Sequence, residues 1–437
     1  MVLTTEAQQS EINIVSLKTS IGYKITEFGF IPEDWNQATL GDKTIKIGSG
    51  ITPTGGERIY KQSGRPFLRS QNIGKGHLLI DAIAYIDEET HETFKSTEVK
   101  VKDVLLNITG ASIGRCAVAD ERVQGGNVNQ HVCIIRTNKN ELDSDFLNYF
   151  LLSSAGQSQI DSFQAGGNRE GLNFGQIRSF TLPCPSLKEQ ITIAATLKDM
   201  DSLINCLDQL ISKKRNIKLA ATQQLLTGKQ RLPGFKDEWQ VVNMSDNFSL
   251  KARIGWQGLT TAEYLEAGDY LLVTGTDIAN GRINWADCFC VDFCRYNQDK
   301  NIQLQVGDVL LSKDGTIGKV AYIDYLPRPA TLNSGVFVIR PKNKKVDSLY
   351  LFYILKSNIF IDYLNKLQAG STISHLYQKD FVGFKFLSPS IKEQMSIATI
   401  LTEMDTELST LEQQLSKARN LKQGMMQELL TGRIRLI

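Results

Sequence analysis

The chain has 437 residues, of which 41% are hydrophobic and 22% charged, and its formal net charge is +2. This length allows two or three domains with separate cores, and the composition is ordinary for a soluble globular protein. The small net charge neither supports nor excludes nucleic acid as a partner, because a basic surface can be local.

The first residues, MVLTTEAQQSEINIV, lack the basic and apolar regions of a signal peptide, and no apolar run reaches the roughly 18 residues that span a membrane. We therefore expect a cytoplasmic protein. The cysteines do not form the pattern of a disulfide framework. The cluster Cys288, Cys290 and Cys294 suggests a metal, but zinc would need a fourth ligand and no histidine is near in sequence. We predict reduced structural thiols and no metal site.

A long internal repeat organises the chain. The segment PSLKEQITIAATLKDMD, which begins at Pro185, returns as PSIKEQMSIATILTEMD at Pro389. Between residues 185–232 and 389–436, 24 of 48 positions are identical at a constant shift of 204. This period is too long for a solenoid unit and fits a whole domain plus a connector.

The predicted elements follow this repeat along the chain. After an N-terminal segment (1–30), residues 31–182 and 233–386 form two globular halves of mixed α/β class (α+β), with more strand than helix. We expect strands at DVLLN and HVCIIR in the first half and at DVLLS and GVFVIR in the second, and helices at DFLNYFLLSS and SLYLFYILKS. Trp35 and Trp239 are predicted core residues. The turns TGASIGR and DGTIGK do not fit the phosphate-loop pattern and are interpreted as β-turns.

A long helix follows each half, within residues 183–232 and 387–437. Ser186 and Ser390 are predicted N-caps, and a glutamate three residues later, at Glu189 and Glu393, predicts a capping box. Glycines at 228 and 432 are expected C-terminal stops. Each helix then has about 40 residues and a length of roughly 60 Å.

Apolar residues recur along both helices in steps of four and three, a heptad seam that must be buried. We predict an antiparallel coiled coil between the two copies; packing of each helix on its own globular half is the alternative. The first seam stops at Lys214, so the pairing is expected to loosen over the last two turns. The predicted helix-pairing residues are Ile193, Leu197, Met200, Ile204, Leu207, Ile211, Ile397, Leu401, Met404, Leu408, Leu411 and Leu415.

Catalytic motifs are missing from the sequence: there is no Walker A motif, no GxGxxG opening a helix, no NPPY or DPPY, no HExxH and no CxxC pair. Prominent carboxylates such as Asp103 and Asp308 are explained by turns. Two related but non-identical domains suit two non-identical half-sites, so asymmetric bipartite double-stranded DNA is the expected target.

Polar and basic side chains that hydrogen-bond bases or phosphates follow strands in both halves and differ between them. For any single residue, a solvated polar loop is the alternative. The predicted DNA-binding residues are Arg69, Ser70, Gln71, Asn72, Lys75, Ser112, Arg115, Asn129, Arg169, Thr274, Thr276, Asp277, Asn280, Arg282, Lys313, Thr316, Lys319 and Asn333.

The repeated PSxKEQ helix start, the LLTGKxRL helix end, the GF…EW entry and the GDVLL…G…IGK block resemble the specificity subunits of type I restriction-modification systems, from about Gly22 to Ile437. The resemblance implies two target recognition domains, each reading one half of an interrupted DNA sequence, and a helical spacer that docks two methyltransferase subunits. Those subunits would bind S-adenosylmethionine and methylate adenine, and restriction subunits that use ATP and Mg would join them. The chain itself would have no catalytic residue and no cofactor.

Three alternatives remain open. The first is a fusion of methyltransferase and recognition domains, against which the missing adenine-methyltransferase motif argues. The second is a recognition subunit of another defence system that uses the same domains. The third is a coiled-coil scaffold that never touches DNA.

Overall fold

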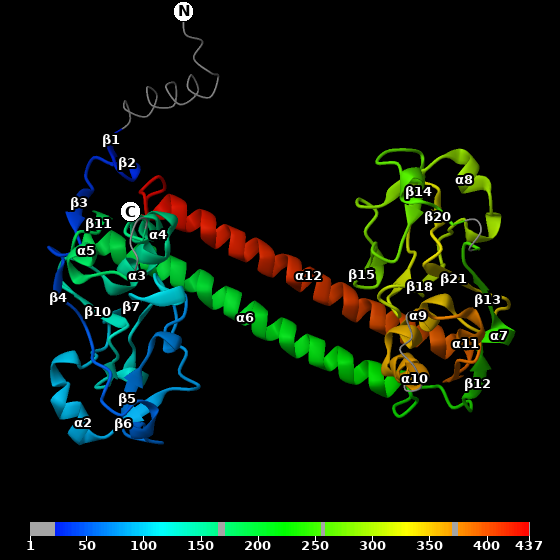
Figure 1. The fold of residues 1–437 in the computed structure, drawn as a ribbon, viewed down its shortest axis with the longest axis horizontal. Helices are drawn as coiled ribbons and strands as arrows, with labels where there is room; N and C mark the ends of the chain where they lie inside the picture. The colour runs from blue at the N-terminus through cyan, green and yellow to red at the C-terminus, as the bar shows by residue number, and fades with distance from the viewer. Residues whose placement is uncertain (1–21, 165–170, 255–257, 369–374, 437) are drawn as a thin grey trace, which may run out of the picture. The chain divides into compact units, whose positions relative to one another are not determined.

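The computed structural model describes residues 22–164, 171–254, 258–368 and 375–436 (Figure 1). It divides into two compact units, and we describe each by itself. Unit 1 comprises Met1–Leu207 and Gln414–Ile437, and unit 2 comprises Asp208–Gln413. Each unit therefore contains one globular half and parts of both long helices.

Unit 1 has a four-stranded antiparallel sheet of order β4-β10-β7-β8 and a three-stranded sheet of order β6-β5-β9, in which β5 and β9 are parallel. Its strands are β1 (Tyr23–Thr26), β2 (Gly29–Pro32), β3 (Asn36–Thr39), β4 (Thr44–Ser49), β5 (Arg65–Leu68), β6 (Ala84–Ile86), β7 (Val104–Asn107), β8 (Cys116–Val118), β9 (Asn127–Val128), β10 (Val132–Thr137) and β11 (Thr181–Cys184). Its shorter helices are α2 (Glu88–Thr93), α3 (Ser144–Leu152), α4 (Ser154–Ser162) and α5 (Phe174–Arg178).

Unit 2 repeats this topology with sheets of order β13-β21-β18-β19 and β17-β14-β20. Its strands are β12 (Gln240–Asn243), β13 (Phe248–Lys251), β14 (Tyr270–Val273), β15 (Ile278–Ala279), β16 (Arg282–Ile283), β17 (Phe289–Val291), β18 (Val309–Ser312), β19 (Val320–Tyr322), β20 (Ala330–Leu332), β21 (Val336–Pro341) and β22 (Lys385–Ser388). Its shorter helices are α7 (Met244–Asn247), α8 (Phe293–Asn297), α9 (Ser348–Lys356), α10 (Asn358–Gln368) and α11 (Gln378–Phe381).

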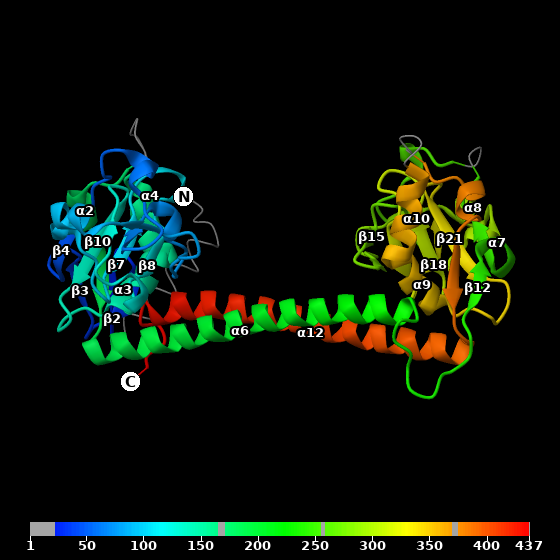
Figure 2. The same cartoon turned by 90° about the horizontal axis from the view of Figure 1, so that it is seen from below.

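The long helices are α6 (Leu187–Leu226) and α12 (Ile391–Leu429), and both units contain a stretch of each (Figure 2). Gly228 and Gly432 follow them with φ of 68° and 70°, the left-handed conformation that ends a helix. The predicted helices and their stops are confirmed, as are the mixed α/β class and the strands predicted in the four apolar runs.

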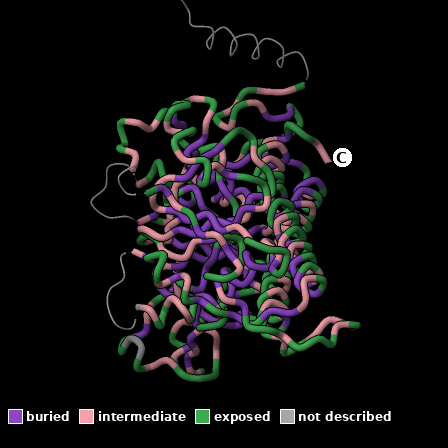
Figure 3. Tube along the Cα trace, turned by 90° about the vertical axis from the view of Figure 1, so that its right-hand side faces the viewer, coloured by how far each residue is buried: buried purple, intermediate pink, exposed green. Residues whose placement is uncertain are grey.

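Residues of the strands and of the helices packed on them make up most of the buried set, which is purple in Figure 3. Trp35 is fully buried, as predicted, in a core that also holds Ile193 and Leu197 from the start of α6 and Leu429 from the end of α12. Trp239 is only half-buried and packs against the edge of the unit 2 core. Both long helices therefore contribute to the core of the globular half in their unit.

The long helices run antiparallel to each other within each unit. In unit 1 the Lys422 Nζ lies 2.6 Å from the Asp201 carboxylate, and in unit 2 Lys218 pairs with Asp405. These two pairs are equivalent in the repeat. All twelve predicted helix-pairing residues are buried or half-buried. Ile193, Leu197, Ile397 and Leu401 are buried in the cores of the globular halves, so pairing of the whole seam stays a prediction.

The expectation that the pairing loosens after Lys214 is wrong. The helix continues to Leu226, ion pairs cross to α12 directly after the break in the seam, and Leu225 and Leu226 of the last turn are buried in the unit 2 core. The Lys214 Nζ lies 2.6 Å from the Glu407 carboxylate, and an Arg215 nitrogen lies 2.6 Å from Glu412. Long basic side chains cover apolar surface with their stems while their charged ends pair across the helices.

The capping box predicted at the start of α6 is only half correct. The Glu189 N–H donates to the Ser186 hydroxyl at 3.3 Å, so the serine caps the helix. The Glu189 carboxylate, however, accepts hydrogen bonds from the Arg435 guanidinium at 2.6 and 2.9 Å and from the Trp35 indole N–H at 3.2 Å. The carboxylate is therefore used in a tertiary ion pair rather than at its own helix start.

This contact recurs in both units, and we call it the arginine latch: an arginine after one long helix binds the glutamate at the start of the other. In unit 2 the Arg231 guanidinium makes two 2.7 Å bonds to the Glu393 carboxylate and lies 5.7 Å from the centre of the Trp239 ring. In unit 1 Arg435 also binds Asp34 at 2.9 Å, and this hydrogen bond lowers the pKa of the Asp34 carboxyl.

The glutamine of the PSxKEQ motif is identical in both copies, and it makes equivalent hydrogen bonds in both units. The Gln190 side chain accepts from the Asp143 N–H at 2.8 Å and donates to the Pro185 carbonyl at 3.0 Å. Gln394 makes the equivalent bonds to Asp347 at 2.9 Å and to Pro389 at 2.9 Å. These bonds fix the start of each long helix against the start of α3 or α9.

Candidate nucleic-acid interface

Four loops meet at one side of the sheets in each unit and carry most of the predicted DNA-binding residues. Loop 1 follows β5 or β14 (residues 69–78 and 274–283), and loop 2 follows β7 or β18 (108–115 and 313–319). Loop 3 joins β9 to β10 or β20 to β21 (129–131 and 333–335), and loop 4 leads into α5 or α11 (171–173 and 375–377). We call these four loops together the loop surface.

Backbone hydrogen bonds tie the loops of unit 1 to one another. The Asn129 N–H of loop 3 donates to the Leu68 carbonyl, at the start of loop 1, at 2.9 Å. The Ile108 N–H of loop 2 donates to the His131 carbonyl of loop 3 at 3.0 Å, and the Leu172 N–H of loop 4 donates to the Ile108 carbonyl at 2.9 Å. Segments distant in sequence thus form one continuous surface.

Unit 2 has the same three bonds at the equivalent positions. The Asn333 N–H donates to the Val273 carbonyl at 2.9 Å, and the Lys313 N–H donates to the Gly335 carbonyl at 2.9 Å. The Leu376 N–H donates to the Lys313 carbonyl at 2.8 Å. The frame of the loop surface is therefore the same in both units although most of its side chains differ.

Loop 1 of unit 2 is a tight hairpin between β15 and β16. Its two turn residues are Asn280, with φ of 53°, and Gly281, with φ of 85°. Asn-Gly is the dipeptide that favours a two-residue hairpin turn with both residues at positive φ. The hairpin exposes Asn280 and Arg282, whereas loop 1 of unit 1 places Lys75 on a turn closed by a 2.9 Å bond from the Gly74 N–H to the His77 carbonyl.

Three of the predicted DNA-binding residues are buried and hold their own loops. Asn72 is 1% exposed and accepts from the Arg69 N–H at 3.0 Å. Asp277 is 6% exposed and accepts from the Thr274 N–H at 2.7 Å, and Asn129 is 7% exposed and accepts from the His131 N–H at 3.1 Å. Their side chains shape the loop surface from within.

The other predicted residues on these loops reach the surface to different degrees. The exposed ones are Gln71, Lys75, Arg115, Thr276, Asn280, Arg282 and Thr316. The half-buried ones are Arg69, Ser70, Ser112, Thr274, Lys313, Lys319 and Asn333. Arg169 lies outside the described residues. Basic groups thus occur in both loop surfaces, as binding to phosphates requires.

Some half-buried members also support neighbouring loops. The Lys319 Nζ donates to the Gly275 carbonyl at 3.3 Å, which joins loop 2 to loop 1 in unit 2. The Asn333 side chain donates to the Tyr264 hydroxyl at 2.6 Å. Lys313 lies over the Phe337 ring at 5.5 Å.

Two contacts of the loop surface were not predicted from the sequence: Thr109 with His131, and Asp314 with His375. The Thr109 hydroxyl lies 2.6 Å from the His131 Nδ1, and Asp314 contacts the His375 Nδ1 directly. The only available signal was the presence of a histidine near a glycine-rich turn. His375 is 61 residues from Asp314, so sequence spacing could not reveal that contact.

The cysteine cluster gives no support for a metal. Cys288 and Cys290 are buried and Cys294 is exposed, and burial raises the pKa of the Cys288 thiol to about 12. Within the described part of the chain, the group with metal-ligand spacing is Glu88, His91 and Glu92. Its carboxylates are already neutralised by basic side chains: Glu88 accepts two bonds from Arg65 at 2.7 and 2.8 Å, and Glu92 pairs with a lysine at 3.0 Å.

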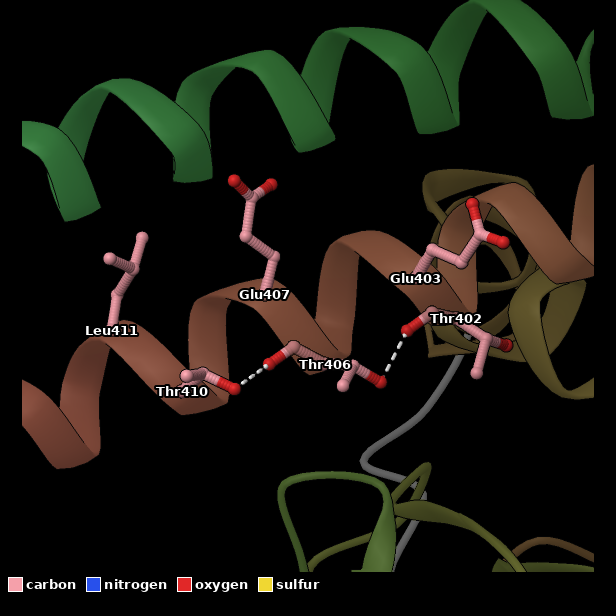
Figure 4. A pocket seen from close by; sticks show the side chains of 6 residues that line it. All are labelled: Thr402, Glu403, Thr406, Glu407, Thr410 and Leu411. Atoms are coloured by element: carbon pink, nitrogen blue, oxygen red, sulfur yellow. Dashed lines mark hydrogen bonds between the residues drawn. The ribbon is translucent and has the colours of Figure 1, made fainter.

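A shallow depression of about 430 Å³ on α12 is a further concave feature (Figure 4). Its lining comes from one helix, and its threonine hydroxyls donate to carbonyls one turn earlier, as from Thr406 to Thr402 at 2.9 Å and from Thr410 to Thr406 at 2.9 Å. Its Glu407 is bound by Lys214. No set of free polar groups converges in this depression, so the loop surface is the better candidate site. Among the described helices, none is long and apolar enough to cross a bilayer.

Comparisons with known proteins identify the family of the chain. The model of the type I restriction modification DNA specificity domain matches twice, at residues 32–214 and 236–418. The chain is 23% identical to the type I restriction enzyme MjaVIII specificity subunit of Methanocaldococcus jannaschii over 419 residues, which cover 93% of this chain and 94% of that one.

Two solved structures share the fold. A type I restriction-modification system S subunit from M. genitalium is 15% identical with a TM-score of 0.59, and the match covers 90% of this chain and 96% of that one. A chain from a study of complex assembly and conformational transition of the type I R-M system is 16% identical with a TM-score of 0.53, covering 92% and 99%.

Two family matches span most of the chain, and each covers one globular half, its loop surface and the greater part of the long helix that follows it. The chain therefore belongs to the family of type I restriction-modification specificity subunits, whose role is DNA sequence recognition.

Proposed function

We propose that each unit reads one half of an asymmetric, two-part DNA sequence through its loop surface, and that the chain is the non-catalytic specificity subunit of its complex. The observation that carries this proposal is the repeated frame: equivalent backbone bonds hold four loops in both units, while the exposed side chains differ. A constant frame with variable side chains suits two half-sites that share geometry but not sequence.

The duplicated helices support a second part of the proposal, the assembly. Their sequences are far more alike than the globular halves, although each helix buries only one side in its unit. We infer that the exposed sides bind two copies of one methyltransferase subunit, and that restriction subunits join through them. In that complex S-adenosylmethionine, ATP and Mg would belong to the partner subunits.

The proposed domain limits are residues 31–182 and 233–386 for recognition, with 183–232 and 387–437 as spacer helices. The glutamine contact joins a recognition segment to its spacer helix, through Asp143 and Gln190, and the latch joins the two spacer segments, through Arg231 and Glu393. Recognition by the loops and assembly by the helices are thus proposed as separable functions joined at fixed contacts.

One prediction separates phosphate binding from base reading in unit 1. Replacing the exposed Lys75 by alanine should weaken binding to all duplexes alike and reduce the salt slope by about one, because one phosphate contact is lost. Replacing the exposed Gln71 by alanine should instead relax discrimination at one base pair. The measurement is binding of the full chain with its methyltransferase partner to specific and random duplexes between 50 and 200 mM salt, a range over which such slopes are resolved.

Lys43→Ala is the matched control, because this lysine pairs with Glu141 away from the loop surface. It should leave the slope unchanged. If the Lys75 variant kept the salt slope of the parent, loop 1 would not be part of the phosphate-binding surface.

A further inference from the structure

In each loop surface, one histidine side chain contacts the residue at the same position of loop 2. In unit 1 that position is Thr109, whose hydroxyl lies 2.6 Å from the His131 Nδ1. In unit 2 it is Asp314, whose carboxylate contacts the His375 Nδ1. The chain has only four histidines, and two of them occupy this one structural position.

The two imidazoles come from different loops. His131 belongs to loop 3, where the equivalent residue of unit 2 is Gly335. His375 belongs to loop 4, where the equivalent residue of unit 1 is Gly171. The backbone bridges show the equivalence, because Thr109 pairs with Gly171 in unit 1 as Asp314 pairs with His375 in unit 2.

Neither imidazole is needed to hold the loops together. Loop 4 of unit 1 keeps its bond from Leu172 to loop 2 at 2.9 Å although glycine replaces the histidine. Loop 3 of unit 2 keeps its bond from Lys313 to Gly335 at 2.9 Å, again with glycine in the histidine position. The backbone bonds between the loops form without either histidine side chain. A purely structural role of the two histidines would therefore be redundant.

The residue at position 109 or 314, which binds the Nδ1 of the histidine, determines whether the Nε2 is a hydrogen-bond donor or acceptor. A carboxylate only accepts, so Asp314 holds the proton of His375 on Nδ1, and the Nε2 of the neutral ring is left as an acceptor. Such an acceptor fits the amino groups of adenine or cytosine in the major groove. The Thr109 hydroxyl donates or accepts, so the His131 Nε2 is not limited to one role.

The surroundings of His375 suit a nucleic acid. Its side chain is 30% exposed, and its ring centre lies 4.5 Å from that of the exposed Tyr377. The Lys379 Nζ lies 5.5 Å from the Tyr377 ring, and the Lys313 Nζ lies 3.7 Å from Asp314. The imidazole thus lies beside an aromatic ring, and each of its two neighbours, Tyr377 and Asp314, has a lysine close by.

We propose that His131 and His375 each read a base edge, one in each half-site, and that Thr109 and Asp314 are the positioning residues that orient them. This inference rests on the proposed function of the loop surfaces. It assigns equivalent roles to two residues that alignment of the repeat does not match.

The test selects bound sequences from random duplexes with the full chain and its methyltransferase partner, in the parent and in two variants. His131→Ala should lose roughly ten- to hundredfold discrimination at one base pair of the unit 1 half-site, and His375→Ala should do so in the unit 2 half-site. Each variant is the control for the other, because the half-site of the unchanged unit should keep its sequence. An unchanged motif in both variants would overturn the inference.

Asp314 variants test the positioning role. Asp314→Ala should relax the same base pair as His375→Ala, and the double variant should be no worse than either, because the two side chains act as one unit. Asp314→Asn retains an acceptor and should keep most of the discrimination. Additive losses in the double variant would contradict the coupling of the two side chains.

The outcomes separate this inference from the proposed function. If the parent complex selects no sequence, the proposed function fails. If the parent selects a two-part sequence and both histidine variants select the same one, only the histidine inference fails.

Discussion

Replacing Arg231 by alanine is expected to lower the free energy of unfolding of unit 2, because it removes the counter-charge of a buried carboxylate. The Glu393 side chain is fully buried, and Arg231 makes both 2.7 Å bonds to its carboxylate. Removing the arginine leaves a buried carboxylate without a counter-charge. The buried indole N–H of the neighbouring Trp239 makes no hydrogen bond in the structure, so it does not compensate.

Thermal and urea unfolding of the full chain measure this effect, with the two units analysed as separate transitions because a multidomain chain is not two-state. Lys229→Ala, two residues away on the exposed surface, is the matched control and should change the free energy by less than about 0.5 kcal/mol. The double variant Arg231→Met with Glu393→Met should recover most of the loss, because it removes the buried charge itself. A loss as large in the double variant would show that the ion pair is not the cause.

The equivalent change in unit 1 should cost less. Arg435→Ala leaves Glu189 with the Trp35 indole N–H as a remaining donor at 3.2 Å. Its carboxylate is also less deeply buried, at 6% exposure of the side chain. We therefore expect Arg435→Ala to lower the free energy of unfolding of unit 1 by less than Arg231→Ala lowers that of unit 2.

Exchanging residues 233–386 for the equivalent segment of a relative should replace one half-site and leave the other unchanged. All four loops of the unit 2 loop surface lie within this segment, and none of the unit 1 loops does. Two altered base pairs would cost about 2–6 kcal/mol of affinity for the parental sequence. Sequence selection from random duplexes measures both halves in one experiment.

The structure specifies which donor segments suit this exchange. Trp239 lies beneath Arg231, and the Tyr353 hydroxyl donates to the Asp405 carboxylate of α12 at 2.9 Å. A donor that keeps a tryptophan and a tyrosine at these positions preserves the junctions, and thermal unfolding of the chimera checks this. A folded chimera in which both half-sites change would contradict the assignment of one half-site to each unit.

The regular elements were predictable because their signals are local. The heptad seam from Ile193 onward and the apolar runs at β10 and β21 have short periods that identify helix and strand directly. The repeat strengthened each prediction, because two independent copies of the pattern had to agree. The glycine stops at 228 and 432 were predictable for the same reason.

The contacts that organise the site were not predictable, because they join distant segments. The capping-box pattern at Glu189 was misleading: its carboxylate finds a full charge on Arg435, 246 residues away, and an ion pair with two hydrogen bonds outweighs one bond to a backbone N–H. The pairing of Asp314 with His375 depends on how loops 2 and 4 meet, which no spacing in the sequence indicates. The loosening expected after Lys214 failed because cross-helix partners such as Glu407 could not be assigned without the register.

The most direct test of the account is the adenine methylation pattern of the host genome with and without this gene. The account predicts that deletion abolishes methylation at a single motif, made of two non-identical halves separated by a gap of fixed length and free sequence, and that other methylated motifs remain. An unchanged methylation pattern, or loss of one continuous palindromic motif, would contradict the reading of two half-sites by two loop surfaces.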